Sequence, residues 1–214
     1  MSLINVTELN QKLTFTLQER SVVTLFNKNA EKNISYLIRL ILGMGTIDSG
    51  QVQILDNKFD HNNLNLNYFK IDWRKKIGFA SDTEGLLSNL TIKDNIFLPL
   101  RYHGDFESEY KNNPEQILNE LEIASTYWNL RPYEVPSIII KKALLARSMI
   151  LSPKILILEN PTRYFPMEKW PFLINLFKKN LSSNTGILIT SDEATFVNLL
   201  KTECKSDIVE IDHD

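Results

Sequence analysis

The chain has 214 residues, of which 43% are hydrophobic and 23% charged, a composition typical of one globular domain with a sizeable core. Its net charge of -2 and its pI near 6.0 give no overall basic field, which argues against nucleic acid or an anionic membrane surface as a partner. Cys204 is the only cysteine, so an internal disulfide and a cysteine-based zinc site are excluded and a reducing compartment is expected.

The start of the chain lacks a basic segment followed by a long apolar core, and no stretch reaches about 18 apolar residues. We therefore expect neither a signal peptide nor a membrane span. Any membrane association would come through a partner.

The N-terminal part predicts β structure that leads into a first buried strand. Residues 3–6, 13–17 and 22–26 are short, rich in β-branched or aromatic side chains, and separated by polar turns. A polar segment, 27–35, follows, and the apolar positions of 36–42 predict a buried helix that ends at Gly43.

The next part predicts a turn and strand over 48–57 and then an asparagine-rich loop up to residue 72, in which we interpret His61 as an ordinary loop side chain. An amphipathic helix is predicted within 107–123, where Pro114 marks a helix start. Later, 169–180 predicts a helix by its apolar spacing, 185–192 a core strand, and 208–211 a last edge strand.

The segment SPKILILENPT, 152–162, is the part around which the chain is organised. Its uninterrupted aliphatic run, 155–158, predicts a short strand buried on both faces of a parallel sheet, with Glu159 at its carboxyl end. Two interpretations are open from these residues alone: a core strand that stops at a solvated acid, or a carboxylate placed to hold the Mg²⁺ of a nucleotide through water.

This segment resembles the Walker B strand of ATP-binding cassette (ABC) transport ATPases, whose pattern is P-K-h-h-h-h-D-E-P-T, with h apolar. Glu159 stands at the position of the Mg²⁺-linked aspartate of that family, and Asn160 at that of the glutamate that polarises the attacking water. An amide cannot take a proton, so the resemblance implies the frame of the motif without its general base.

Other nucleotide-handling motifs of the family are altered in the same way. On the phosphate-binding loop pattern, Asn33 takes a glycine position, Ile34 the lysine and Ser35 the Mg²⁺-binding hydroxyl, and no glycine precedes Gly43. A phosphate loop needs glycines so that backbone N–H groups can close around the phosphates, and it needs a lysine to offset their charge. The resemblance therefore implies a vestigial nucleotide cleft made of these three residues together with Asp82 and Glu159.

Three further motifs depart from the family. Asp82 replaces the Q-loop glutamine, and Ser191 replaces the switch histidine that senses the γ-phosphate. Pro136, Ser137 and Ile138 replace the serine and two glycines of the signature motif, which leaves an apolar surface. Ile138 is interpreted either as ordinary helix packing or as part of an interface with no nucleotide in it.

The segment 77–104 follows the Q-loop region of bacterial ABC importers and is most similar to the ATPases of Mce-type lipid transporters, the retrograde phospholipid or toluene-tolerance class. Leu86, Leu87, Asp94, Asn95, Pro99, Leu100, Arg101 and His103 fall on that pattern without a gap. With Asp82 and residues 136–138, Leu86 and Leu87 form the predicted partner interface.

The resemblance implies an α/β fold of the P-loop NTPase type: a RecA-like, mostly parallel core sheet, an N-terminal antiparallel β part and a helical subdomain. We expect one domain over 1–214, with the helical subdomain inserted at roughly 86–150.

Three functions remain open. The first is a non-catalytic subunit of a membrane transport complex, possibly for lipids, that docks on a permease or a partner ATPase at the inner face of the cytoplasmic membrane, as part of a heterodimer or a homodimer and without nucleic acid. It has no catalytic residue and no cofactor. The second is a weak ATPase that binds ATP and Mg²⁺ through Ser35, Glu159 and the displaced Lys28 and Lys32. The third is a scaffold or regulatory protein no longer tied to transport.

Overall fold

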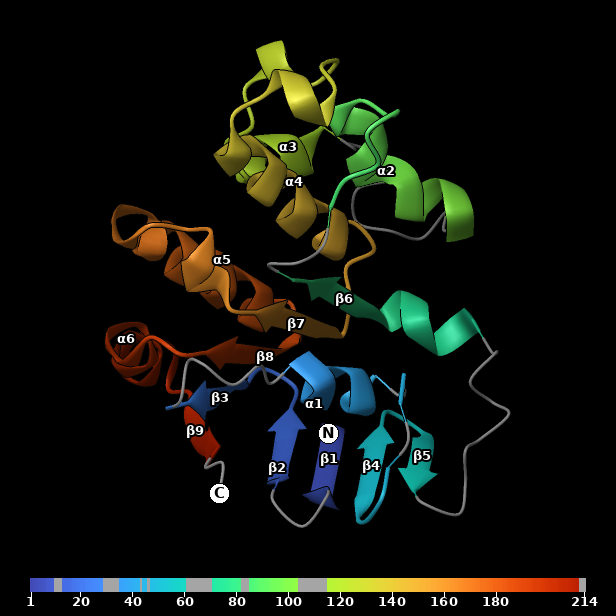
Figure 1. Cartoon of the computed structure of the whole chain (residues 1–214), viewed down its shortest axis with the longest axis vertical. Coiled ribbons are helices and arrows are strands. Elements are labelled where there is room, and N and C mark those ends of the chain that lie inside the picture. Colours follow the sequence, from blue (N-terminus) through green and yellow to red (C-terminus); the bar gives the residue numbers. More distant parts are fainter. Residues whose placement is uncertain are drawn as a thin grey trace.

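Two sheets and six α-helices make up the described part of the chain (Figure 1). The computed structural model describes residues 1–9, 13–28, 35–42, 44–45, 47–60, 71–81, 85–103 and 115–211. Within these ranges, no helix has the length and the apolar character that a membrane crossing requires.

The larger sheet is parallel and has five strands in the order β6–β7–β8–β3–β9. The bounds in that order are Ile77–Ala80, Ile155–Glu159, Gly186–Ser191, Val22–Asn27 and Asp207–Ile211. The non-consecutive order means that helices connect the strands by crossing over the sheet, as parallel pairing requires. This sheet is the expected core sheet, and β9 is the expected edge strand.

The smaller sheet is antiparallel and has four strands in the order β2–β1–β4–β5. The bounds in that order are Leu13–Gln18, Ser2–Leu9, Gln51–Ile54 and Asn57–Asp60. The prediction of a loop from residue 57 onward is therefore wrong for 57–60. Backbone pairing with β4 overrides the low strand propensity of Asn57. Residues 61–70, which include His61, lie outside the described residues.

The helices cover the parallel sheet (Figure 1). On one face, α5 and α6 lie beside β8 and β3, and α2, α3 and α4 gather at one end of the molecule. On the other face, α1 lies between the two sheets. The bounds are Ser35–Ile41 for α1, Ile92–His103 for α2, Gln116–Glu120 for α3, Ser137–Met149 for α4, Trp170–Ser182 for α5 and Ala194–Cys204 for α6.

The predicted helix within 107–123 is confirmed for α3 alone, which begins two residues after Pro114. Gly43 and Pro114 themselves lie outside the described residues. The cluster of α2, α3 and α4 lies within the range where we predicted a helical subdomain; the domain boundaries stay a prediction.

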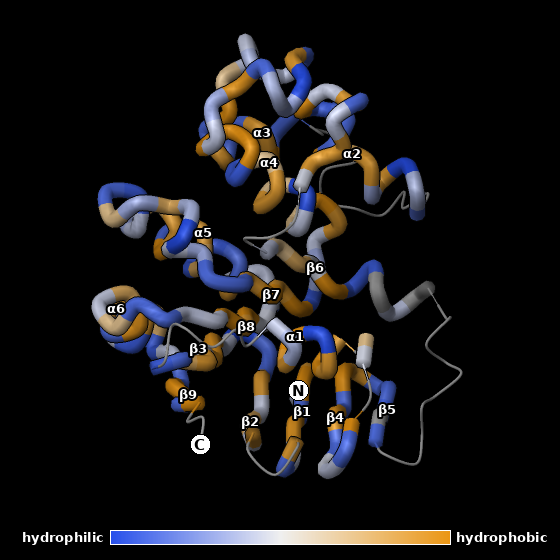
Figure 2. Tube along the Cα trace, viewed as in Figure 1, coloured by the Kyte–Doolittle hydropathy of each residue, from blue (hydrophilic) through white to orange (hydrophobic). Residues whose placement is uncertain are grey.

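Strand β7 joins two hydrophobic cores, one on each face of the parallel sheet. All five of its residues are buried. Leu156 and Leu158 point into the core shared with α2–α6, whereas Ile155 and Ile157 point into the core shared with α1 and the antiparallel sheet. Figure 2 shows hydrophobic residues concentrated on β7 and β8. Burying one such side chain stabilises the fold by about 1.5–3 kcal/mol, so the run 155–158 holds both layers against the sheet.

The contact between β6 and α4 depends on Gly78. A Cβ atom on this residue would lie 2.0 Å from the carbonyl oxygen of Ser148, and a backbone atom cannot move aside cheaply. We predict that Gly78→Ala lowers the free energy of unfolding by about 1–3 kcal/mol or more, as overpacking does, measured by chemical denaturation.

Gly85→Ala is the matched control, because within the described part of the chain no atom beyond its immediate chain neighbours lies within 4 Å of its added Cβ. It should change the free energy of unfolding by less than about 0.5 kcal/mol. Equal effects of the two substitutions would contradict the packing argument.

Candidate functional site

A cavity of about 390 Å³ lies between α1 and the carboxyl ends of β6 and β7. Ligands of open α/β sheets bind at this end of the strands. The lining residues come from α1 and the segment after it, from β6 and the residue after it, and from β7: Ser35, Arg39, Leu42, Met44, Phe79, Ser81 and Glu159. The structure thus brings Ser35 and Glu159, two residues of the predicted cleft, to one cavity. Asn33, Ile34 and Asp82 lie outside the described residues.

Glu159 ends β7 with a buried carboxylate. Only 2% of the residue is exposed, and its Oε2 accepts a hydrogen bond of 2.5 Å from the hydroxyl of Ser81. Its Oε1 is buried and accepts no hydrogen bond within the described part of the chain. A buried polar atom without a partner costs about 1–3 kcal/mol, and more if the group is charged. The interpretation of Glu159 as a solvated acid is therefore wrong.

Asn160 has a left-handed backbone conformation, with φ 43° and ψ 57°, which asparagine tolerates better than most residues do. Its N–H donates to both the carbonyl oxygen and the hydroxyl of Thr190, at 3.1 Å each. Thr190, a buried polar residue on β8, fixes this turn, a role that the sequence did not indicate. The amide side chain at position 160 cannot act as a general base.

Ser191 is fully buried at the end of β8, and its hydroxyl accepts a hydrogen bond of 3.1 Å from the N–H of Glu193. Its side chain therefore holds the start of α6. The neighbouring Asp192 pairs with Arg163 at 2.7 Å, which ties the loop after β8 to the loop after β7. Because half of the Arg163 side chain is exposed, this pair contributes about 0–1 kcal/mol.

Lys28 follows β3 and pairs with Glu210 on the neighbouring strand β9. A lysine held by a carboxylate on the adjacent strand is a weaker source of positive charge for a bound phosphate. Lys32, the other displaced lysine, lies outside the described residues.

The donor set of the cavity fits Mg·ATP only in part. A hydroxyl at Ser35 and a carboxylate at Glu159 are oxygen ligands of the kind that Mg²⁺ uses, usually through water. Among the described residues, however, no group of three or more His, Cys, Asp or Glu side chains could hold a metal ion. Position 160 offers no base, and the hydroxyl of Ser191 is turned into the fold. Neither Asn160 nor Ser191 therefore offers a side chain that takes up a proton readily.

The segment before α2 is held in place by Asn95, which is fully buried. Its Oδ1 accepts from the N–H of Leu87 at 2.7 Å, and its Nδ2 donates to the carbonyl oxygens of Leu87, Leu90 and Thr91 at 3.0–3.3 Å. The sequence pattern includes Asn95, but only the structure gives this role. As a result, Leu87 lies on the surface, 48% exposed, while Leu86 packs against the larger core.

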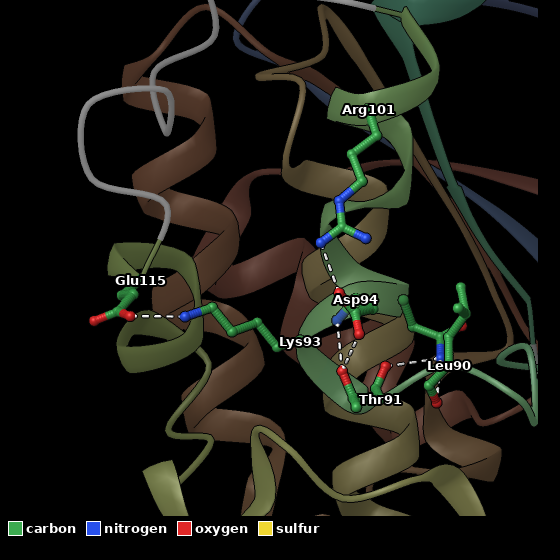
Figure 3. A network of polar contacts seen from close by, with 7 residues as sticks. Leu90, Thr91, Lys93, Asp94, Arg101 and Glu115 are labelled. Carbon is green, nitrogen blue, oxygen red and sulfur yellow. Dashed lines mark hydrogen bonds and ion pairs between the residues drawn. The ribbon is translucent and has the colours of Figure 1, made fainter.

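A polar network fixes the first turn of α2 (Figure 3). The hydroxyl of Thr91 accepts from the N–H of Asp94 at 3.1 Å and donates to its carboxylate at 2.7 Å, which makes Thr91 the N-cap. Arg101 pairs with the same carboxylate at 2.6 Å, and Lys93 pairs with Glu115 at 2.8 Å. The hydrogen bond from Thr91 and then the bond and charge of Arg101 lower the pKa of Asp94 below its ordinary value of 3.8.

The other predicted interface residues lie at the N-terminus of α4. Pro136 and Ser137 are exposed, and Ile138 is partly buried against the larger core. Both interpretations of Ile138 thus remain open. One turn later, the buried Lys142 pairs with Glu122 at 3.0 Å and lies 5.1 Å from the ring of Phe172, which holds α4 against its neighbours.

Comparison with known proteins gives one family model, described as ABC transporter, which matches residues 11–163. The methionine import ATP-binding protein MetN 1 of Acinetobacter baylyi is 27% identical over 185 residues, which cover 84% of this chain and 48% of that protein. The lipoprotein-releasing system ATP-binding protein LolD of Leptospira interrogans is 23% identical over 197 residues, covering 92% and 81%. The macrolide export protein MacB of Campylobacter jejuni is 29% identical over 120 residues, covering 56% and 19%.

This chain thus spans about half the length of the first relative and about a fifth of the last. Among solved structures, the dimeric structure of a bacterial ABC transporter cassette matches with a TM-score of 0.76 at 17% identity and covers 98% of this chain and 91% of that chain. An ATP-binding subunit of an ABC transporter matches with a TM-score of 0.79 at 17% identity, covering 99% and 88%. The predicted cassette fold is confirmed.

Removal of the cap of α2 should destabilise the protein. We predict that Thr91→Ala lowers the free energy of unfolding by about 0.5–2 kcal/mol, because two hydrogen bonds with Asp94 are lost. Thr202→Ala is the matched control, since the hydroxyl of Thr202 bonds only to carbonyl oxygens inside α6. Chemical denaturation of both variants checks the prediction, which fails if the control is equally destabilised.

The charge of Asp94 should contribute to stability in a pH-dependent way. Since folding lowers the pKa of Asp94 below 3.8, the contribution is full well above that value and is lost as the pH falls through the folded-state pKa. We therefore predict that Asp94→Asn is less stable than the wild type at neutral pH and that the difference narrows below about pH 4.

Denaturation curves across this pH range measure the difference. Asp207→Asn, at an exposed position on β9, is the control. A difference between wild type and Asp94→Asn that stays constant down to the lowest pH would contradict the assignment.

Proposed function

Because the chain belongs to the ABC transporter family, we propose that it is a non-catalytic cassette subunit of a membrane transport complex, which docks on a permease or on a second ATPase subunit. In this role it needs neither ATP nor Mg²⁺. It would lie at the inner face of the cytoplasmic membrane through these partners. Its role would be to bind them through its folded surface, without catalysis.

The observation that carries the proposal is Asn160. It follows the buried Glu159 at the end of β7, and its backbone is fixed by Thr190. A general base contributes typically about 10²–10⁴ to a reaction rate, and an amide cannot serve as one. A base at this position would have to come from a different residue, and Ser191 on the next strand offers no imidazole.

The loops after β7 and β8 support the same proposal. Arg163 and Asp192 join these loops by an ion pair, and the hydroxyl of Ser191 is occupied by the N–H of Glu193. Both contacts serve the folded chain itself. The segment 29–34 contains no glycine to let backbone N–H groups close around phosphates.

The proposed docking surface includes the exposed residues Leu87, Pro136 and Ser137, together with the partly buried Leu86 and Ile138. An exposed apolar side chain held on an ordered loop is suited to bind a complementary pocket. Asp82, the remaining predicted interface residue, lies outside the described residues. Pairing with a second cassette, of the same or another chain, is part of the same proposal.

Lipid transport through an Mce-type system remains our prediction for the substrate class, on the pattern of residues 86–103. The relatives reported above carry other printed functions: methionine import, lipoprotein release and macrolide export.

A second candidate function is a weak ATPase. The observation in its favour is that Ser35 and Glu159 line one cavity of about 390 Å³, with an unsatisfied carboxylate oxygen that a hydrated Mg²⁺ would meet. A scaffold protein outside transport is the third candidate, and it differs from the first only in its partner.

Titration with Mg·ATP separates the first two candidates. We predict no saturable binding in the micromolar range by calorimetry, and no phosphate release above that of Glu159→Gln, because the altered positions supply neither a base nor a phosphate cradle. Glu159→Gln is the control, since it replaces the carboxylate of the cleft by an amide whose oxygen can still accept the hydrogen bond from the hydroxyl of Ser81. Micromolar affinity or hydrolysis in the wild type that this variant loses would refute the proposal.

Co-purification from detergent-solubilised membranes of the native host separates the first candidate from the third. We expect the full chain to retain a permease or a second cassette subunit, and Leu87→Asp to lose it, because a charge replaces an exposed apolar contact. Met167→Asp is the matched control, an exposed apolar residue outside the proposed docking surface. Retention of the partner by Leu87→Asp would count against this surface.

A further inference from the structure

The cavity beneath α1 has a buried floor and an exposed mouth. Glu159 and Ser81 on its floor are each 2% exposed, whereas Met44, on its lining, is 55% exposed and Arg39 is exposed as well. The volume of about 390 Å³ falls within the range of roughly 300–1,000 Å³ that small-molecule pockets occupy. The cavity is therefore large enough for a small organic ligand that enters from the side of Arg39.

The floor lacks one hydrogen-bond donor. Ser81 satisfies Oε2 of Glu159, but Oε1 is buried without a partner, and no ion pair within the described ranges involves this carboxylate. The strongest partner for a buried carboxylate is a cationic N–H donor. A ligand that completes the floor should carry an ammonium group at its inner end.

At the mouth of the cavity, the ligand should carry a negative charge. The guanidinium of Arg39, an exposed side chain that lines the cavity, suits a carboxylate or phosphate. Ser35 lies one turn earlier on the same face of α1 and lines the same cavity. Between the floor and the mouth, Leu42 and Phe79 supply apolar walls. A hydrated Mg²⁺ would satisfy the floor, but it would be repelled by the guanidinium and would leave the apolar walls without a contact.

We propose that this cavity binds a small zwitterion, a primary amine whose ammonium group meets Glu159 and whose anionic group meets Arg39, with its carbon chain against Leu42 and Phe79. The inference rests on the proposed function, because a cleft that holds Mg·ATP has no room for a second ligand. If no nucleotide binds in this cleft, the cleft is open to a ligand of another class, a small zwitterion.

The probes are ω-amino acids of increasing length, namely β-alanine, 4-aminobutyrate and 6-aminohexanoate, titrated into the full chain by calorimetry and followed by ligand-observed NMR. Since Glu159 and Arg39 line one cavity of limited volume, we expect saturable binding with a maximum at one chain length. The acid and the amine of the same length, each with one charge, should bind at least about tenfold more weakly.

Substitutions test which cavity residue contacts which charged group of the ligand. Glu159→Gln should weaken the best amino acid by about tenfold or more, and Arg39→Gln should weaken it while leaving the simple amine unchanged. Because Arg39 is exposed, its substitution tests the proposal even if Glu159→Gln fails to fold. Lys201→Gln, an exposed charge on α6, is the matched control and should bind as the wild type does.

Absence of saturable binding for all three amino acids, or equal binding to the wild type and Arg39→Gln, would overturn the inference. The same calorimeter run with Mg·ATP distinguishes this failure from that of the proposed function. Micromolar binding of Mg·ATP would refute both proposals, whereas binding of neither Mg·ATP nor the amino acids would refute only this one.

Discussion

The burial of β7 on both faces is the constraint on which the rest of the structure depends. Its alternating aliphatic side chains reach two separate cores, so the strand cannot shift along the sheet without exposing apolar surface on each side. Because β7 is fixed in this way, its last residue is fixed as well. Glu159 is thus carried into the interior at the point where the strand ends, beside a cavity rather than in solvent.

The turn after β7 is held by contacts within the chain. Asn160 takes a left-handed conformation and is bonded to Thr190 on the neighbouring strand, and the loops after β7 and β8 are joined again by Arg163 and Asp192. Each of these contacts is made within the chain itself, and none requires a nucleotide. The two loops thus keep the cassette fold while these polar groups bond to each other.

The fold was largely predictable from the sequence, because buried parallel strands and amphipathic helices leave strong local patterns. The strand at 155–158 was recognised by its uninterrupted aliphatic run, and the helix at 169–180 by the spacing of its apolar residues. The strand at 57–60 was missed because asparagine and lysine carry little strand signal, and its pairing with β4 is a tertiary effect. The candidate site was less predictable. The contacts of Ser81, Thr190 and Asn95 join segments that the sequence alone does not place together.

The hydrogen bonds of Asn95 have a consequence for the binding of a partner protein. The buried amide of Asn95 donates three hydrogen bonds to the loop that carries Leu87 and accepts one from it, so this loop is ordered before any partner binds. Ordering a flexible loop at an interface normally reduces affinity, since conformational entropy is lost on binding. Here that entropy is lost when the chain folds, and a partner that contacts Leu87 would meet a preorganised surface.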